Sequence, residues 1–250
     1  MSVNHMEMMR PGPVCQEREI YERLLPLEDA RIIELGCGKA EKTQMIAKTV
    51  RVAQIVALEV DAIQHSKNQL LERLPNVRFA LGGAQAIPAA DESFDIVLMF
   101  KSLHHVPMDQ MEKALSEIRR VLRPGGLAYI SEPVYAGAFN DILRLFHDER
   151  VVREAAFNAV RHAVSARVLD LARQEFFSTP MHFDNFEHFE ADVIKVTHTH
   201  HDLSPELLTE VRNRFIRHMT PNGADFLMPI RVDLLRKRSC APRCTDCVIA

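Results

Sequence analysis

The sequence lacks long apolar runs and lacks an excess of positive charge. No stretch of the 250 residues approaches the roughly 18 apolar residues of a membrane span, and Met1 to Cys15 has no apolar core of a secretory signal. The net charge of −3 provides no overall positive field that would hold a nucleic acid. We therefore expect a cytoplasmic protein without a nucleic-acid partner, and its oligomeric state stays open.

Cysteine is also scarce, and the odd count of five favours free thiols over a disulfide framework. The chain ends in Cys247-Val-Ile-Ala250, which has the form of a prenylation box and follows several basic residues. Prenylation of Cys247 would place the protein on membranes, and otherwise we expect no membrane association. Alternatively, Cys240, Cys244 and Cys247 bind a soft metal or remain thiols.

The first half of the chain alternates short apolar runs with amphipathic helical patterns. The apolar runs are Arg31 to Leu35, Ile55 to Val60, Val77 to Leu81, Phe94 to Met99 and Leu127 to Ser131. This alternation predicts an α/β fold with a doubly wound, mostly parallel sheet.

The second half departs from this alternation. Residues 134–188 have a mostly helical pattern without an obvious strand, which predicts a helical cap inserted over the site. Asp192 to His198 and Phe226 to Leu235 look like strands, separated by a helix with Ser204 as its N-cap, and would complete a seven-stranded sheet. The expected parts are a flexible leader (1–15), a core (16–133), the cap (134–188), the end of the core sheet (189–236) and a cysteine-containing tail (237–250).

The sharpest motif is a glycine turn, Glu34-Leu-Gly-Cys-Gly38, which follows a buried strand and precedes a helix. Glycines there let a ligand approach the backbone closely. Glu41 stands where a dinucleotide fingerprint has its third glycine, and the Glu34 carboxylate would repel a pyrophosphate. The turn therefore favours a cationic ligand without phosphate. S-adenosylmethionine (SAM), with its ammonium and sulfonium groups, meets that requirement.

A second acid ends the next predicted strand. Glu59 follows Gly36 by 23 residues, close to the spacing of roughly 20 at which an acidic side chain takes ribose hydroxyls. Glu34 and Glu59 would then face one crevice at the edge of the sheet.

Taken with three later motifs, these residues resemble the class I SAM-dependent methyltransferases that act on small molecules. The resemblance covers about residues 20–133. It implies a Rossmann-like methyltransferase fold, SAM as the cofactor and in-line methyl transfer to a small-molecule acceptor. The matching segments are Glu34 to Gly38, Ala57 to Glu59, Phe94 to Leu98, Leu103 to Val106 and Leu122 to Gly126.

The resemblance also implies a set of cofactor contacts. The glycine turn would lie against the methionine part, Glu59 would bind the ribose, and the backbone near Phe100 would hold the amino acid end. Gly83 stands where the family often has Asp, so Gln85 or a backbone carbonyl would accept from the adenine amino group. The expected cofactor-binding residues are Glu34, Gly36, Cys37, Gly38, Glu59, Val60, Gly83, Ala84, Gln85, Phe100 and Lys101.

Three residues at the expected mouth of the site, His104, His105 and Tyr135, are candidates for proton transfer. An unperturbed histidine has a pKa near neutrality and could accept a proton from a substrate. The alternative is that one of these histidines packs beside the cofactor and the other caps the following helix.

The histidines after the predicted cap also form a cluster. His198 and His200 would share one strand face, close to His201, but no carboxylate–histidine set completes a metal site in the sequence. We expect no metal.

Three other functions remain open from the sequence. An RNA methyltransferase would show a basic cap, but acids are interspersed among the arginines of residues 134–188. A non-catalytic SAM-binding scaffold would retain the same glycines and Glu59. A nicotinamide oxidoreductase shares the architecture but conflicts with the missing third glycine and with Glu34. The methyl acceptor and its accepting atom are not determined by these motifs.

Overall fold

The computed structural model describes residues 6–196 and 201–239, and within them eight strands form one sheet. The strands are β1 (Arg31–Leu35), β2 (Gln54–Glu59), β3 (Val77–Leu81), β4 (Phe94–Phe100), β5 (Leu122–Pro133), β6 (Asp170–Phe183), β7 (Met219–Thr220) and β8 (Gly223–Arg236). Their order is β3-β2-β1-β4-β5-β8-β6, with β7 paired to β8. Strands β1 to β5 are parallel to one another, and β8 is antiparallel to both β5 and β6. The mostly parallel sheet is confirmed, with β7 as a two-residue addition.

Helices connect and cover the strands. The α-helices are α1 (Glu17–Leu24), α2 (Glu41–Thr49), α3 (Ala62–Asn68), α4 (Met111–Val121), α5 (Ala138–Leu143), α6 (Arg150–Ser165), α7 (Phe186–Phe189) and α8 (Pro205–Ile216). Two 3-10 turns, η2 (Leu103–His105) and η3 (Met108–Gln110), follow β4, and a π-helical turn, η4 (Glu190–Ile194), follows α7. At the start of α8 the Leu207 N–H donates to the Ser204 hydroxyl oxygen at 3.3 Å, which confirms the predicted N-cap.

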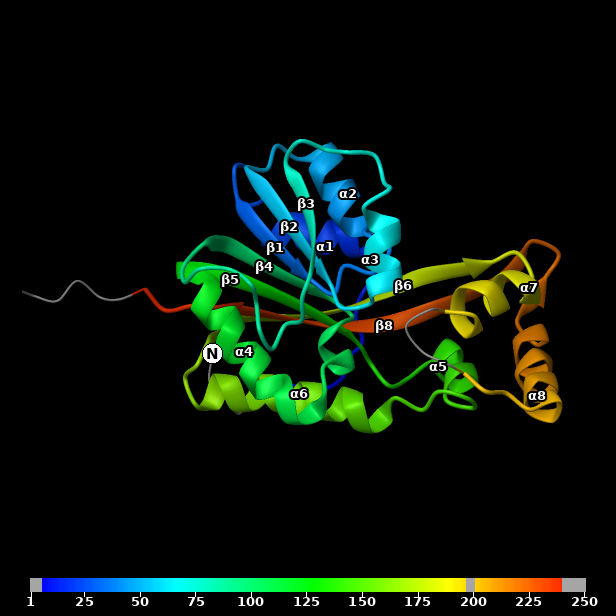
Figure 1. Cartoon of the computed structure of the whole chain (residues 1–250). Helices are drawn as coiled ribbons and strands as arrows, with labels where there is room; N and C mark the ends of the chain where they lie inside the picture. The colour runs from blue at the N-terminus through cyan, green and yellow to red at the C-terminus, as the bar shows by residue number, and fades with distance from the viewer. Residues whose placement is uncertain (1–5, 197–200, 240–250) are drawn as a thin grey trace, which may run out of the picture.

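The apolar side chains of each central strand divide between the two faces of the sheet. In β1, Ile33 and Leu35 pack in a cluster with residues of α4 and α6, whereas Ile32 packs in a second cluster with residues of α1 and α2. Successive side chains of a strand point to opposite faces, so helices on both sides bury most positions of the central strands. Figure 1 shows α4 and α6 running together beneath the sheet.

The far ends of β6 and β8 carry a separate helical lobe. These two strands of 14 residues each extend past the other strands, and α5, α7 and α8 lie around their ends (Figure 1). Phe183 of β6 and Phe226 of β8 pack with Phe139, Phe189 and Phe215 from the three helices, at ring-centroid separations of 5.0 to 6.3 Å. Aromatic side chains therefore supply a second apolar core.

Two sequence-based predictions about the second half are wrong. The segment 134–188, expected to be helical without a strand, contains α5 and α6 but also the long strand β6. This strand lies at the edge of the sheet, where Pro180 and polar side chains are tolerated because one side needs no partner. The strand expected at Asp192 to His198 is not formed, because residues up to Ile194 form the π-helical turn η4; His198 lies outside the described residues.

Cys15 and Cys37 are free thiols, as expected for these two positions. The tail cysteines Cys240, Cys244 and Cys247, and with them the prenylation and soft-metal alternatives, lie outside the described residues. A search of the described helices found none with the length and apolar character needed to cross a bilayer.

Candidate functional site

The turn after β1 uses two glycines with left-handed backbone, Gly36 at φ +74° and Gly38 at φ +52°. A Cβ atom on Gly36 would lie 2.9 Å from the Cβ of Ser102, so a side chain does not fit there. A Cβ atom on Gly38 would meet no heavy atom within 4 Å. The protein backbone is therefore open to a ligand at Gly38.

Glu59, the last residue of β2, holds this turn in place. Its carboxylate accepts hydrogen bonds from the backbone N–H groups of Gly38 at 2.7 Å, Val60 at 2.8 Å and Asp61 at 2.9 Å. Two carboxylate oxygens offer about four acceptor positions, so capacity remains for a ligand hydroxyl. The structure thus brings the glycine turn and Glu59 to one edge of the sheet, and their part in binding a cofactor stays a prediction.

Asn68 of α3 also forms hydrogen bonds to the turn, and no sequence motif predicted this contact. Its side-chain amide donates to the Gly38 carbonyl oxygen at 2.8 Å and to the Cys37 Sγ at 3.5 Å. Burial raises the pKa of the Cys37 thiol, so this side chain stays a neutral hydrogen-bond partner. The turn is consequently fixed from both β2 and α3.

The Glu34 side chain is directed towards α2. The Thr43 hydroxyl donates to its carboxylate, and Glu34 is only 2% exposed. Burial raises the pKa of this carboxyl to about 7, an effect that the Thr43 hydrogen bond only partly offsets. The Glu34 carboxyl is thus held by Thr43, and its contact with a cofactor stays a prediction.

The unfolding free energy of the wild-type protein is expected to fall as the pH rises, because Glu34 ionises. Replacing Glu34 with glutamine should remove this fall. In the unfolded chain this carboxyl ionises near its ordinary value of 4.5, but in the folded protein only near 7, so ionisation favours the unfolded state. The wild-type protein should lose up to about 3 kcal/mol of unfolding free energy through this group between about pH 5 and about pH 8. Urea unfolding at several pH values measures the loss.

The exposed acid Glu41 on the same helix, α2, provides a matched control. Glu41→Gln should follow the wild-type pH dependence, whereas Glu34→Gln should be flatter and more stable at the alkaline end. If the unfolding free energy depended on pH in the same way in all three proteins, ionisation of Glu34 would not be the cause of the loss.

In the turn after β3, position 83 has no room for a side chain. A Cβ atom on Gly83 would lie 2.5 Å from the Oε1 of Gln85, so the Gln85 amide occupies the space that a side chain at position 83 would need. This placement supports the prediction that Gln85 takes over the acceptor role at the adenine position.

At the end of β4, Lys101 adopts a left-handed backbone and donates its N–H to the Ser131 carbonyl oxygen at 2.7 Å. The Lys101 Nζ lies 3.5 Å from the carboxylate of Glu17 on α1. Glu17 is 2% exposed, and neither of its carboxylate oxygens has a hydrogen-bond partner in the described structure. Buried acceptors normally accept hydrogen bonds, so this carboxylate, which among the described residues has only the ion pair with Lys101, is suited to an incoming donor such as an ammonium group.

The other residues predicted to bind the cofactor present mainly backbone atoms to the site. The Phe100 ring packs against the rings of Tyr21 and Tyr129 at 5.7 and 5.5 Å, so its side chain belongs to the core. Ala84 is buried, and the Val60 side chain is exposed. Their predicted contacts would therefore be made by the main chain.

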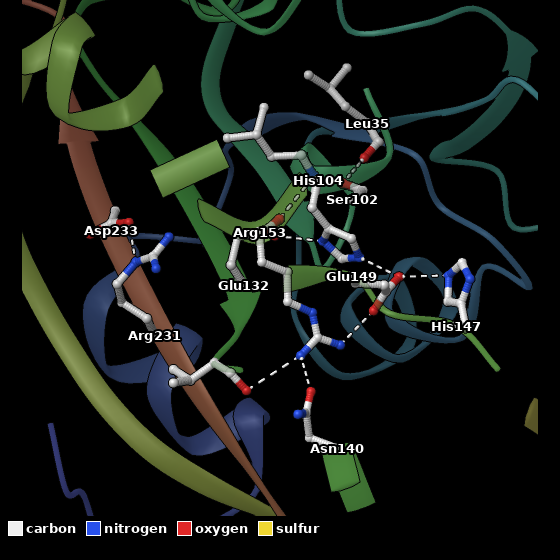
Figure 2. A network of polar contacts seen from close by, with 12 residues as sticks. Leu35, Ser102, His104, Glu132, Asn140, His147, Glu149, Arg153, Arg231 and Asp233 are labelled. Atoms are coloured by element: carbon white, nitrogen blue, oxygen red, sulfur yellow. Dashed lines mark hydrogen bonds and ion pairs between the residues drawn. The ribbon is translucent and has the colours of Figure 1, made fainter. Parts of the chain in front are cut away.

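His104, on η2 directly after β4, lies between two buried carboxylates (Figure 2). Its Nδ1–H donates to Glu132 at 2.5 Å, and its Nε2 lies 3.5 Å from the Oε1 of Glu149. Burial lowers the pKa of His104, but the charges of Glu132 and Glu149 outweigh this effect and raise it to about 9. His104 is then protonated at neutral pH, which disfavours the hypothesis that it accepts a proton from a substrate.

Further contacts fix Glu149 from α6 and α5. The Arg153 guanidinium donates to Glu149 Oε2 at 2.5 Å and to the Asn140 Oδ1 at 3.0 Å, and the His147 Nε2 lies 3.0 Å from Glu149 Oε1 (Figure 2). The spacing of Glu149 and Arg153, four residues apart, is a signal from which a helical ion pair could have been predicted. No motif indicated that this pair meets His104.

The remaining proton-transfer candidates lie in different surroundings. His105 is exposed, and its ring centroid is 4.1 Å from that of His104. Tyr135 is half-buried, and its hydroxyl donates to Asp148. His198 and His200 lie outside the described residues. The structure thus brings His104 and His105 together, and a catalytic role of either histidine or of Tyr135 stays a prediction.

Comparison with known proteins places these features in a family. Residues 33–130 match the family model described as "Methyltransferase domain". The chain is 34% identical over 100 residues to a probable phthiotriol/phenolphthiotriol dimycocerosates methyltransferase 2 of Mycobacterium ulcerans, which covers 40% of this chain and 38% of that protein. It is 35% identical over 137 residues to the O-methyltransferase rstn1 of Aspergillus nomiae, covering 52% of this chain and 60% of that protein.

Solved structures share the fold over most of the chain. The YcgJ protein of Bacillus subtilis superposes with a TM-score of 0.62 at 17% identity, covering 89% of this chain and 98% of that one. The chain spans only 38% and 60% of the two curated relatives above. The match over residues 33–130 includes the glycine turn, Glu59 and the end of β4, so this part of the chain is similar to methyltransferase domains.

Proposed function

We propose that this protein transfers a methyl group from SAM to a small-molecule acceptor. The observation that carries the proposal is the turn at Gly38, which is open to a ligand and hydrogen-bonded to the Glu59 carboxylate within the matched methyltransferase domain. The names of the two curated relatives favour a small-molecule acceptor, and the name of the O-methyltransferase favours oxygen as the accepting atom.

The residues at the sheet edge fit the cofactor of this family. SAM carries an ammonium, a sulfonium and two ribose hydroxyls but no phosphate. The buried Glu17 carboxylate has no hydrogen bond within the described part of the chain and could accept from an ammonium, Glu59 retains acceptor capacity for one ribose hydroxyl, and Gln85 lies at the turn that the resemblance assigns to adenine. Glu34 adds negative charge beside the turn, which favours a cation.

Bound SAM supplies a methyl carbon on a positively charged sulfur, which keeps the electron pair of the broken C–S bond when the acceptor attacks. The protein then needs to hold the acceptor in line with that bond and to exclude water. A base is needed only for an acceptor that carries a proton. Because His104 is already protonated and held by Glu132, His105 and Tyr135 are the remaining candidates for that step.

The decisive experiment combines binding with turnover. Calorimetry measures SAM affinity, and incubation with a metabolite extract and SAM labelled in its methyl group detects small molecules that gain one labelled methyl. We expect saturable binding and a labelled product that depends on the protein. Binding without any labelled product would favour the non-catalytic scaffold, and absence of binding would overturn the proposal altogether.

Replacing Glu59 with alanine is expected to weaken SAM binding by about 10- to 100-fold. The variant loses the ribose acceptor and also frees the Gly38 N–H that Glu59 now holds. Calorimetry gives the two dissociation constants. Glu72→Ala is the control, because this acid is exposed and pairs only with Lys48 in the described structure. Equal affinity of Glu59→Ala and wild type would remove Glu59 from the site.

We also propose that the protein acts in the cytosol and has no nucleic-acid partner. The net charge of −3 supports the absence of a nucleic-acid partner, because binding to a polyanion depends on concentrated positive charge. Cell fractionation and salt-dependent retention of RNA are the tests, and RNA retained at low salt would favour an RNA acceptor.

A further inference from the structure

A cluster of potential metal ligands lies on the α6 side of the described site. His104, His105 and Glu149 each offer one ligand atom, and these atoms all lie within 4.8 Å of one another. His104 and Glu149 are buried, whereas His105 reaches the surface. Two imidazoles and one carboxylate are a set that binds divalent transition metals.

The separation of the two buried ligand atoms suits a shared ion. His104 Nε2 and Glu149 Oε1 are 3.5 Å apart. Imidazole nitrogens and carboxylate oxygens bind zinc at about 2.0 to 2.2 Å, which in a tetrahedral site places neighbouring ligand atoms about 3.4 Å apart. The separation of these two atoms is therefore that of neighbouring ligands of one ion.

Each buried ligand is also oriented by a second side chain. Glu132 accepts from the Nδ1–H of His104 at 2.5 Å, which directs the Nε2 towards Glu149. Arg153 binds the Oε2 of Glu149 at 2.5 Å and leaves Oε1 on the side of the histidine (Figure 2). A carboxylate on the far nitrogen of a histidine is the usual outer partner of a metal-binding imidazole.

One further imidazole contacts the same carboxylate oxygen, and another lies beside that imidazole. His147 Nε2 lies 3.0 Å from Glu149 Oε1, and the ring of His201 lies 4.7 Å from the ring of His147, centroid to centroid. The acids Glu132 and Glu149 face the cluster from β5 and from the start of α6, and Arg153 is the cation that faces it from α6. Imidazoles and carboxylates thus meet from three separate segments of the chain, namely η2, β5 and residues 147–149.

We propose that His104, His105 and Glu149 bind a divalent first-row transition-metal ion such as zinc, with Glu132 and Arg153 as positioning residues. The ion replaces the proton on His104 Nε2, since metal ligands bind in their deprotonated form. Three protein ligands leave at least one coordination position for water or for an oxygen of a substrate. This site departs from the expectation, drawn from the sequence, that the protein has no metal site.

The test is a titration with Co²⁺, whose visible absorption reports its ligands. The protein is first treated with a chelator, and Cys240, Cys244 and Cys247 are replaced by serine so that tail thiolates do not contribute. We expect one equivalent of Co²⁺ to bind, and His105→Ala and Glu149→Gln to weaken binding at least about tenfold. Competition with Zn²⁺ then gives the affinity for zinc.

His162→Ala is the matched control, because this exposed histidine lies on α6 away from the cluster and pairs with Glu112. It should bind Co²⁺ like the unsubstituted protein. Thermal unfolding without metal checks that each variant is folded; if Glu149→Gln is not, His105→Ala decides, since His105 is exposed. No Co²⁺ binding, or equal affinity in His105→Ala, overturns the proposal. The readout needs no SAM, so it is independent of the proposed methyl transfer.

Discussion

Replacing Gly38 with valine is expected to abolish SAM binding while the protein remains folded. The Cβ of residue 38 would meet no protein atom within 4 Å, so the branched side chain would project into the space open to the ligand. The positive φ of +52° costs a residue with a Cβ about 1 to 2 kcal/mol, which a folded domain of this size tolerates. Calorimetry should show a dissociation constant at least about 1000-fold higher than in wild type.

The matched control is Gly125→Val. Gly125 has a comparable positive φ of +83°, but it lies in the amino-terminal part of β5, where its N–H donates to the Lys237 carbonyl oxygen. The same backbone strain is then introduced away from the carboxyl ends of the strands. Gly125→Val should bind SAM like wild type. Retained SAM binding in Gly38→Val would show that the ligand lies elsewhere.

Replacing Glu132 with alanine is expected to lower the free energy of unfolding by about 3 to 5 kcal/mol. Glu132 is 1% exposed and accepts hydrogen bonds from the Leu103 N–H at 2.9 Å and from His104 Nδ1 at 2.5 Å. Its removal leaves the His104 charge buried with a single, longer contact to Glu149, and leaves a backbone donor without its acceptor. Urea unfolding followed by circular dichroism measures the change.

The exposed pair of Glu187 and Arg212 provides the comparison. Its atoms are 3.2 Å apart, but the two side chains are 65% and 45% exposed. Solvent screens such a pair, so Glu187→Ala should lower the free energy of unfolding by less than about 1 kcal/mol. If Glu132→Ala cost no more than this control, the buried network would not be a source of stability.

The sequence alone was sufficient for the parallel half of the sheet. The central strands β1, β2 and β4 are short apolar runs that are mostly buried, and a helix with one apolar side follows each of them, so the pattern is local. The position of Glu59 followed from the same logic, because the carboxyl ends of neighbouring parallel strands meet at one edge. The hydrogen bond from Gly38 to Glu59 shows that this edge is shared.

The edge strand β6 could not be recognised in the same way. Its sequence mixes charged residues, Pro180 and several aromatic residues, and only part of it is buried. An edge strand is stabilised by its pairing with β8, more than 40 residues later in the chain, rather than by its own alternation. The segment Asp192 to His198 shows the opposite error, since its β-branched residues favoured a strand that the structure does not form up to Ile194.

The sequence by itself determined the order of the core elements, the glycine turn and the acid at the end of β2, because these depend on patterns within a few residues. Only the tertiary structure decided that Glu17 is buried without a hydrogen-bond partner and that His104 is held between Glu132 and Glu149. Such contacts join segments that are far apart in the chain, and their energies depend on burial. Neither separation in space nor burial is encoded in a local motif.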